Sequence, residues 1–174
     1  MPLRIRFRAV ADRIDVVTAC VGRAVAWCLL AVVIVQVAVV LMRYVLGLGS
    51  IWLQESILYA HASLFMLAAA WTLQQGGHVR VDIFYADASP QRKALADLVG
   101  AIVFLLPLTL ALIALSVPYV LRSWVILERS REASGLPLVF LLKTLIPVFA
   151  LLLGLQGTSQ AIRAALVLAG TRER

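Results

Sequence analysis

The chain has 174 residues, of which 63% are hydrophobic and 14% charged, whereas about 25% of the residues in an average soluble domain are charged. The mean hydropathy is +0.97, and the formal net charge is +7. This composition argues against a soluble protein.

The apolar residues are gathered into four uncharged runs. The runs cover residues 24–42, 56–79, 98–121 and 144–162. At about 1.5 Å of rise per residue, a helix of about 19 residues crosses the roughly 30 Å of hydrocarbon in a bilayer. The sequence therefore predicts an all-α integral membrane protein with four transmembrane helices, at about 24–42, 52–76, 97–121 and 142–163. The segments between the spans are too short to enclose a core of their own, so residues 1–174 form a single four-span domain.

The segment before the first span, residues 1–23, has an amphipathic pattern. Its apolar residues recur at helical spacing, and its charged residues fall on the other side; these are Val10, Ile14, Val17 and Val21 against Asp12, Arg13 and Asp15. The pattern predicts a short N-terminal amphipathic helix lying on the cytoplasmic surface. The apolar run that follows is longer than the 7–15 residues usual in a signal peptide, which favours an uncleaved anchor.

Basic residues divide unequally between the two sides of this arrangement. Eleven lie before the first span, between the second and third spans, and after the fourth, and five lie in the other two loops. The positive-inside rule then places both termini in the cytoplasm. A bilayer accounts for this charge pattern, so we expect no nucleic-acid partner.

The cysteines and histidines exclude two classes of cofactor site. Cys20 and Cys28 are eight residues apart on one expected helix, about 12 Å along its axis, and cannot form a disulfide with each other. His61 and His78 are roughly 25 Å apart along the second span, so one haem cannot use both. We therefore expect no cofactor in this chain.

A small and polar stripe runs along the second span. Gln54, His61, Ala68, Thr72 and Gln75 recur at spacings of 7, 7, 4 and 3 residues, which keeps them near one helical face. Such a stripe in a membrane helix usually faces protein, where side chains hydrogen-bond and backbones approach closely. An alternative is that His61 relays protons, although no carboxylate within the membrane accompanies it.

The first two spans are joined by a short hairpin with a charge on each side. Arg43 ends the first span and Glu55 begins the second, and the glycines between them permit a tight reversal. The two charges either pair across the hairpin or reach the headgroups and water separately. On the other side of the bilayer, Ser89 is expected to cap the helix that starts at Pro90.

Three motifs give the chain a resemblance to a known family. They are Arg43-Tyr44, Trp52-Leu53-Gln54-Glu55-Ser56 and Gly76-Gly77-His78-Val79-Arg80-Val81-Asp82. In this combination the chain resembles the small membrane subunit of tripartite ATP-independent periplasmic (TRAP) transporters, the DctQ-like family, whose members share an arginine after the first span, Trp-x-x-Glu opening the second span and His-Val/Ile-Arg-Val-Asp closing it. The later segments Glu128–Pro137 and Lys143–Pro147 are similar to one branch of the family. Many members have a second acid where this chain has Ser56.

The resemblance implies a subunit of the bacterial inner membrane that lacks enzymatic activity. It implies a secondary transporter in which a periplasmic receptor captures an organic anion and a large permease subunit moves it inward, driven by sodium. The small subunit is then a scaffold bound to the large one, with sodium as the coupling ion of the large subunit. Candidate partner-contact or structural residues are Arg43, Trp52, Gln54, Glu55, His61, Ala68, Thr72, Gln75, His78, Arg80 and Asp82.

Two other functions are less well supported by the residues. A stand-alone four-span exporter needs an acid deep in a helix, whereas Glu55 lies only about 5 Å beyond Trp52. A membrane redox subunit or enzyme needs a convergent set of catalytic or metal-binding residues, and the spans contain none.

Overall fold

A computed structural model of the chain describes residues 2–78, 85 and 87–171. Its elements are all helical: α1 (Pro2–Val45), α2 (Ile51–Gln74), α3 (Pro90–Val99), the short π-helix η1 (Gly100–Leu105), α4 (Leu106–Val125) and α5 (Val139–Thr171). Four stretches are long and apolar enough to cross a membrane: Arg4–Val45, Ile51–Gln74, Pro90–Val125 and Val139–Gly170. The predicted all-α fold with four spanning helices is confirmed.

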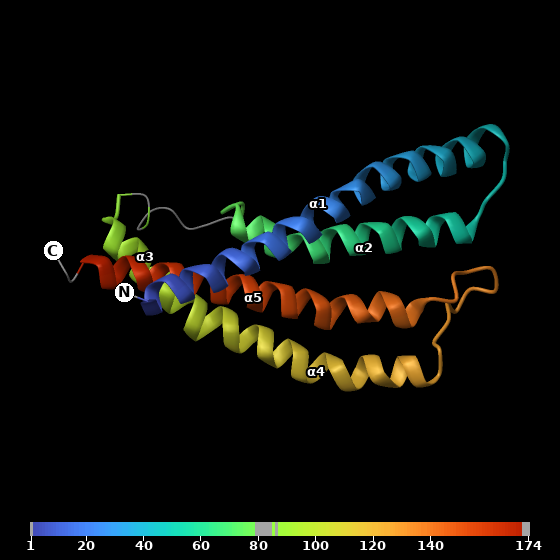
Figure 1. The fold of residues 1–174 in the computed structure, drawn as a ribbon. Coiled ribbons are helices and arrows are strands. Elements are labelled where there is room, and N and C mark those ends of the chain that lie inside the picture. Colours follow the sequence, from blue (N-terminus) through green and yellow to red (C-terminus); the bar gives the residue numbers. More distant parts are fainter. Residues whose placement is uncertain (1, 79–84, 86, 172–174) are drawn as a thin grey trace.

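Helix α5 is the central element of the bundle. It packs against α1, α2, α3 and α4, while α1 packs against α2 as an antiparallel pair. Helix α1 begins and α5 ends at one end of the molecule, here called the termini end (Figure 1). The loops 46–50 and 126–138 lie at the opposite end, here called the loop end. This placement is what an even number of spans requires.

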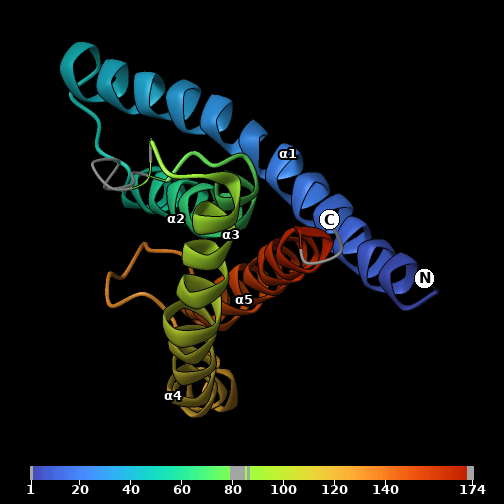
Figure 2. The same ribbon diagram turned by 90° about the vertical axis from the view of Figure 1, so that its left-hand side faces the viewer.

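Helix α1 differs from its prediction. The sequence predicts a short amphipathic helix on the cytoplasmic surface over residues 1–23, whereas the structure has residues 2–23 and the first span in one continuous helix of 44 residues, strongly inclined to the other helices (Figure 2). The physical reason is that no residue between Leu3 and Val45 interrupts the helical hydrogen bonds, and Gly22 is held by packing against Trp71. The acids Asp12 and Asp15 therefore face α5, where they bind Arg163.

Small residues form most of the buried apolar core. Seven buried alanines supply it: Ala11, Ala70, Ala94, Ala101, Ala150, Ala161 and Ala164. In a bilayer the apolar environment of the lipid removes the hydrophobic drive for helix association, so helices associate through close backbone approach and hydrogen bonds. The alanines allow that approach around α5.

Local sequence signals set several helix boundaries. The hydroxyl oxygens of Ser50 and Ser89 accept hydrogen bonds from the backbone N–H groups of Leu53 and Arg92, which caps α2 and α3. The cap predicted at Ser89 is confirmed. Between α3 and α4 the helix widens into η1, where the N–H of Leu106 donates to the carbonyl of Ala101. Pro107, which has no N–H and crowds the carbonyl four residues earlier, follows directly, so the wider turn accommodates it.

Candidate functional site

A cluster of polar side chains joins α1 to α5 near the termini end. Asp15 is its centre: Oδ1 accepts hydrogen bonds from Ser159 Oγ at 2.7 Å and Gln156 Nε2 at 3.0 Å. Its other oxygen accepts from Arg163 Nε at 3.1 Å and Nη2 at 2.5 Å. Thr18 donates to Gln156 Oε1 at 2.7 Å. Ser159, Gln156 and Thr18 are at most 2% exposed, so the bonds that these three residues make are shielded from water, whereas Arg163 is more exposed.

Helix α2 is tied to the same cluster through backbone carbonyls. Gln74 Nε2 donates to the carbonyl of Asp15 at 3.1 Å, and Gln160 Nε2 donates to the carbonyl of Leu73 at 3.0 Å. Three helices are therefore fixed in register at one end of the bundle. We call Asp15, Thr18, Gln74, Gln156, Ser159, Gln160 and Arg163 the polar cluster.

The sequence prediction missed the polar cluster. It placed Asp12 and Asp15 on a solvated face and did not consider the polar residues of α5. A signal was available, because Gln156, Ser159, Gln160 and Arg163 follow one another at spacings of 3, 1 and 3 residues near the end of the fourth span. A polar face inside a spanning helix requires partners, and the nearest acids in the first segment are suitable ones.

Glu55 fastens the loop 126–138 to the start of α2. One carboxylate oxygen accepts a hydrogen bond from the Ser130 hydroxyl, and the other accepts from the backbone N–H of Leu136 at 2.5 Å. Of the two alternatives for Arg43 and Glu55, the described residues contain no ion pair between them. The Trp-x-x-Glu motif therefore supplies a carboxylate that orders the second loop at this end.

Replacing Glu55 by alanine should release this loop. Each hydrogen bond to a charged acceptor is worth about 1.5–3 kcal/mol, so hydrogen exchange at the Leu136 amide should become roughly tenfold faster or more. Glu132→Ala is the control, because Glu132 lies on the same loop with an exposed side chain. Equal exchange rates in the two variants would show that Glu55 does not hold the loop.

A second ionic contact joins the loop 126–138 to α5 at the loop end. Glu128 accepts hydrogen bonds from Lys143 Nζ at 2.5 Å and Ser123 Oγ at 2.6 Å, and Lys143 lies 4.3 Å from the centre of the Tyr119 ring. Hydrogen bonding from Lys143 and then Ser123 lowers the pKa of Glu128 below its ordinary value. Glu128 therefore stays ionised at neutral pH and keeps its bond to α5.

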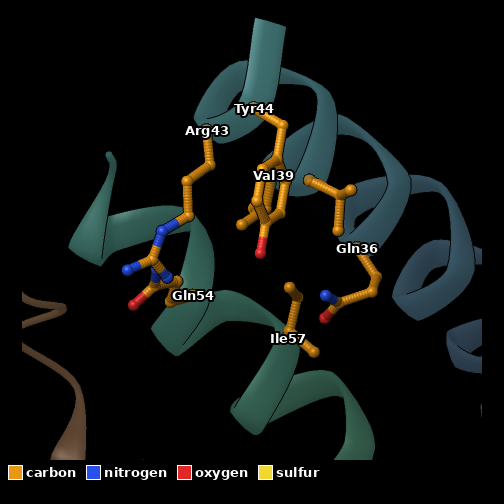
Figure 3. A pocket seen from close by; sticks show the side chains of 7 residues that line it. Gln36, Val39, Arg43, Tyr44, Gln54 and Ile57 are labelled. Atoms are coloured by element: carbon orange, nitrogen blue, oxygen red, sulfur yellow. The ribbon is translucent and has the colours of Figure 1, made fainter. Parts of the chain in front are cut away.

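Arg43 lines a cavity of about 420 Å³ between α1 and α2 at the loop end. The cavity is also lined by Gln36, Val39, Val40, Tyr44, Gln54 and Ile57. Figure 3 shows the guanidinium of Arg43 directed toward Gln54, and the Tyr44 hydroxyl directed into the space between the two helices. Two candidate residues from different motifs, Arg43 and Gln54, thus share one cavity.

The stripe on α2 is divided between two environments. Gln54, His61 and Gln75 are exposed, Gln54 at the cavity between α1 and α2, whereas Ala68 and Thr72 are half-buried. The Thr72 hydroxyl donates to the carbonyl of Ala68 at 3.1 Å, within its own helix. The outer face of α2 combines His61 with exposed Leu58 and Phe65, so it presents a polar group among large apolar side chains.

The motif that closes the second span is only partly described. His78 is exposed, and Arg80 and Asp82 lie outside the described residues. Over the described residues no group of three or more histidine, cysteine or acidic side chains is arranged to hold a metal ion. Cys20 and Cys28 are free thiols.

The family model for the DctQ component of tripartite ATP-independent periplasmic transporters matches residues 32–167. The chain belongs to the DctQ family. The comparisons with curated proteins and with solved structures gave no significant match.

Membership of the DctQ family confirms the resemblance found in the motifs. The protein is the small permease subunit of a TRAP transporter, a multi-pass component of the inner membrane and not an enzyme. Within the DctQ match lie Arg43, Glu55 and the α5 half of the polar cluster, whereas Asp15 precedes it. The α1 segment that completes the cluster is thus outside the part of the chain that the family model covers.

Proposed function

We propose that this DctQ subunit is a scaffold for a sodium-driven importer of an organic acid anion. It binds the large permease subunit, which carries the substrate and sodium sites, and it works with a periplasmic solute receptor. The excess of basic residues on the side of the termini supports an orientation with both termini in the cytoplasm. The loop end then faces the periplasm and the receptor.

The proposal rests on the hydrogen bonds that the polar side chains within the bundle make. Those in the polar cluster bond to one another and hold α1, α2 and α5 together. Substrate and ion sites of secondary transporters are typically built from broken helices near the bilayer midplane. Here α1, α2 and α5 are continuous where the structure describes them. This continuity favours a scaffold role for the chain over a transport site within it.

The outer face of α2 is the proposed contact with the large subunit. His61, Leu58 and Phe65 are exposed along it, and a histidine near mid-membrane is costly unless it meets a polar partner. A contact with protein satisfies the imidazole, and the neighbouring apolar side chains supply packing area.

Replacing His61 by leucine should weaken co-purification of the large subunit. An interhelical hydrogen bond within a membrane is worth about 0.6–2 kcal/mol, so the retained fraction should fall by roughly threefold to thirtyfold. The control is Leu115→Ala on α4, where Leu115 is 77% exposed but lies on another helix. Reconstituted alone in liposomes, the wild-type chain should show no sodium-driven uptake of an organic acid.

Two outcomes would contradict the proposal. Uptake by the chain without a large subunit would overturn the scaffold role. Full assembly of the His61 variant with lost transport would instead support the proton-relay alternative.

A further inference from the structure

We propose that the cavity between α1 and α2 binds the phosphate-bearing headgroup of a membrane phospholipid. The two helices diverge toward the loop end (Figure 1), and the cavity lies between them at the level of Arg43 and Gln54. This level is the edge of the hydrocarbon region, because Arg43 ends the first spanning run and Trp52 opens the second. The proposal goes beyond the scaffold function and does not depend on it.

The chemistry of the lining suits an anion attached to an apolar body. Arg43 offers a planar set of N–H donors, Gln36 and Gln54 offer amide donors, and Tyr44 offers a hydroxyl donor. Arginine binds phosphate oxygens in a bidentate manner. The remaining lining residues, Val39, Val40 and Ile57, form apolar walls against which a glycerol backbone and the first acyl carbons can pack.

Arg43 is available for such a ligand. Over the described residues its side chain makes no ion pair, and Glu55, the nearest acid in the sequence, uses one oxygen for Ser130 and the other for Leu136. An arginine at the hydrocarbon edge that lacks a protein anion gains most from a lipid phosphate at the same depth.

The size of the cavity suits a lipid headgroup. Its volume of about 420 Å³ falls within the roughly 300–1,000 Å³ of small-molecule sites. A phosphate-bearing headgroup with the start of its glycerol backbone therefore fits the cavity.

Native mass spectrometry of the full chain tests this proposal. The chain is purified in mild detergent, both alone and with its large subunit, and is titrated with phosphatidylglycerol in one arm and with inorganic phosphate in the other. The wild-type chain should carry one tightly held phospholipid in both preparations and should bind no phosphate ion. Arg43→Gln should reduce the lipid-bound fraction about fivefold, the factor that corresponds to about 1 kcal/mol for one basic group at a lipid surface.

The control and a second variant separate binding from folding. Arg122→Gln is matched to Arg43→Gln, because Arg122 is also exposed near the loop end but lies on α4 outside the cavity. It should leave lipid binding unchanged, and Gln54→Leu should lower it from the α2 side. Helix content by circular dichroism shows which variants fold.

Three results would overturn the proposal. They are a wild-type chain that carries no bound lipid in either preparation, loss of the lipid when the large subunit is present, and binding of inorganic phosphate in place of phosphatidylglycerol. The second result would assign the cavity to the partner protein, and the third would assign it to a free anion.

Discussion

Replacing Asp15 by alanine is expected to lower the melting temperature of the purified chain by roughly 6–12 °C. The substitution removes the acceptor for Ser159, Gln156 and Arg163. Ser159 and Gln156 are buried, and a buried donor that loses its acceptor costs about 1–3 kcal/mol. A total of about 3 kcal/mol, at about 2–4 °C per kcal/mol for a chain of this size, gives the expected shift.

Asp12 supplies a matched control for this experiment. Its carboxylate binds the same guanidinium, with Oδ1 2.7 Å from Arg163 Nη2, but its side chain is 56% exposed against 18% for Asp15. Exposed ion pairs contribute about 0–1 kcal/mol, so Asp12→Asn should change the melting temperature by only a few degrees. Similar losses for the two variants would mean that the Asp15 effect comes from charge alone and not from the buried hydrogen bonds.

A variant on α5 tests the same cluster from its other side. Gln156→Leu removes the donor to Asp15 and the acceptor for Thr18 while nearly conserving volume. Because Gln156 and Asp15 belong to one network, the double variant with Asp15→Ala should cost less than the sum of the two single variants. Additive losses would show that the two residues act independently.

The sequence predicted those features of the fold that depend on local pattern. Four runs without charge define the spans, and Ser89 before Pro90 defines a helix start; the structure confirms both. These signals need no knowledge of what each helix meets, because the bilayer imposes the length of a span and the helix imposes its own capping requirement.

The contacts between distant segments were not predictable in the same way. Asp15 and Ser159 are 144 residues apart, and Glu55 meets Leu136 across 81 residues. Periodicity placed Asp15 on a polar face but did not indicate whether water or another helix would donate hydrogen bonds to its carboxylate. The acids that suggested a solvated face bind α5 instead.

For the candidate residues of the second span, too, spacing predicted a shared helical face but did not predict which residues other helices would cover. Gln54 and His61 share a face by spacing alone, and the structure leaves both exposed. Spacing also grouped Ala68 and Thr72 with them, but these two are half-buried because α2 packs against both α1 and α5. Any protein surface that covers Gln54 or His61 belongs to another chain, so the sequence of this chain does not identify it.

Replacing Gly22 by alanine should also have a large effect, because Gly22 of α1 lies directly against Trp71 of α2. A Cβ atom added there would lie 2.5 Å from Trp71 Cβ and 2.6 Å from two atoms of the indole ring. These atoms belong to the base of a rigid side chain, so relief requires the helices to separate. Gly22→Ala should therefore destabilise the chain by about 1–3 kcal/mol, the usual cost of overpacking.

Alanine variants of two other glycines serve as controls, and their melting temperatures are compared with that of Gly22→Ala. At Gly157 the new Cβ would lie 2.6 Å from Leu105 Cδ2, the far end of a flexible side chain, and at Gly170 it would meet nothing within 4 Å. Alanine in place of a helical glycine gains up to about 1 kcal/mol when space allows. The expected order of melting temperatures is Gly170→Ala highest, then Gly157→Ala, then Gly22→Ala. If Gly22→Ala melted no lower than Gly157→Ala, the contact between Gly22 and Trp71 would not be what sets the spacing of α1 and α2.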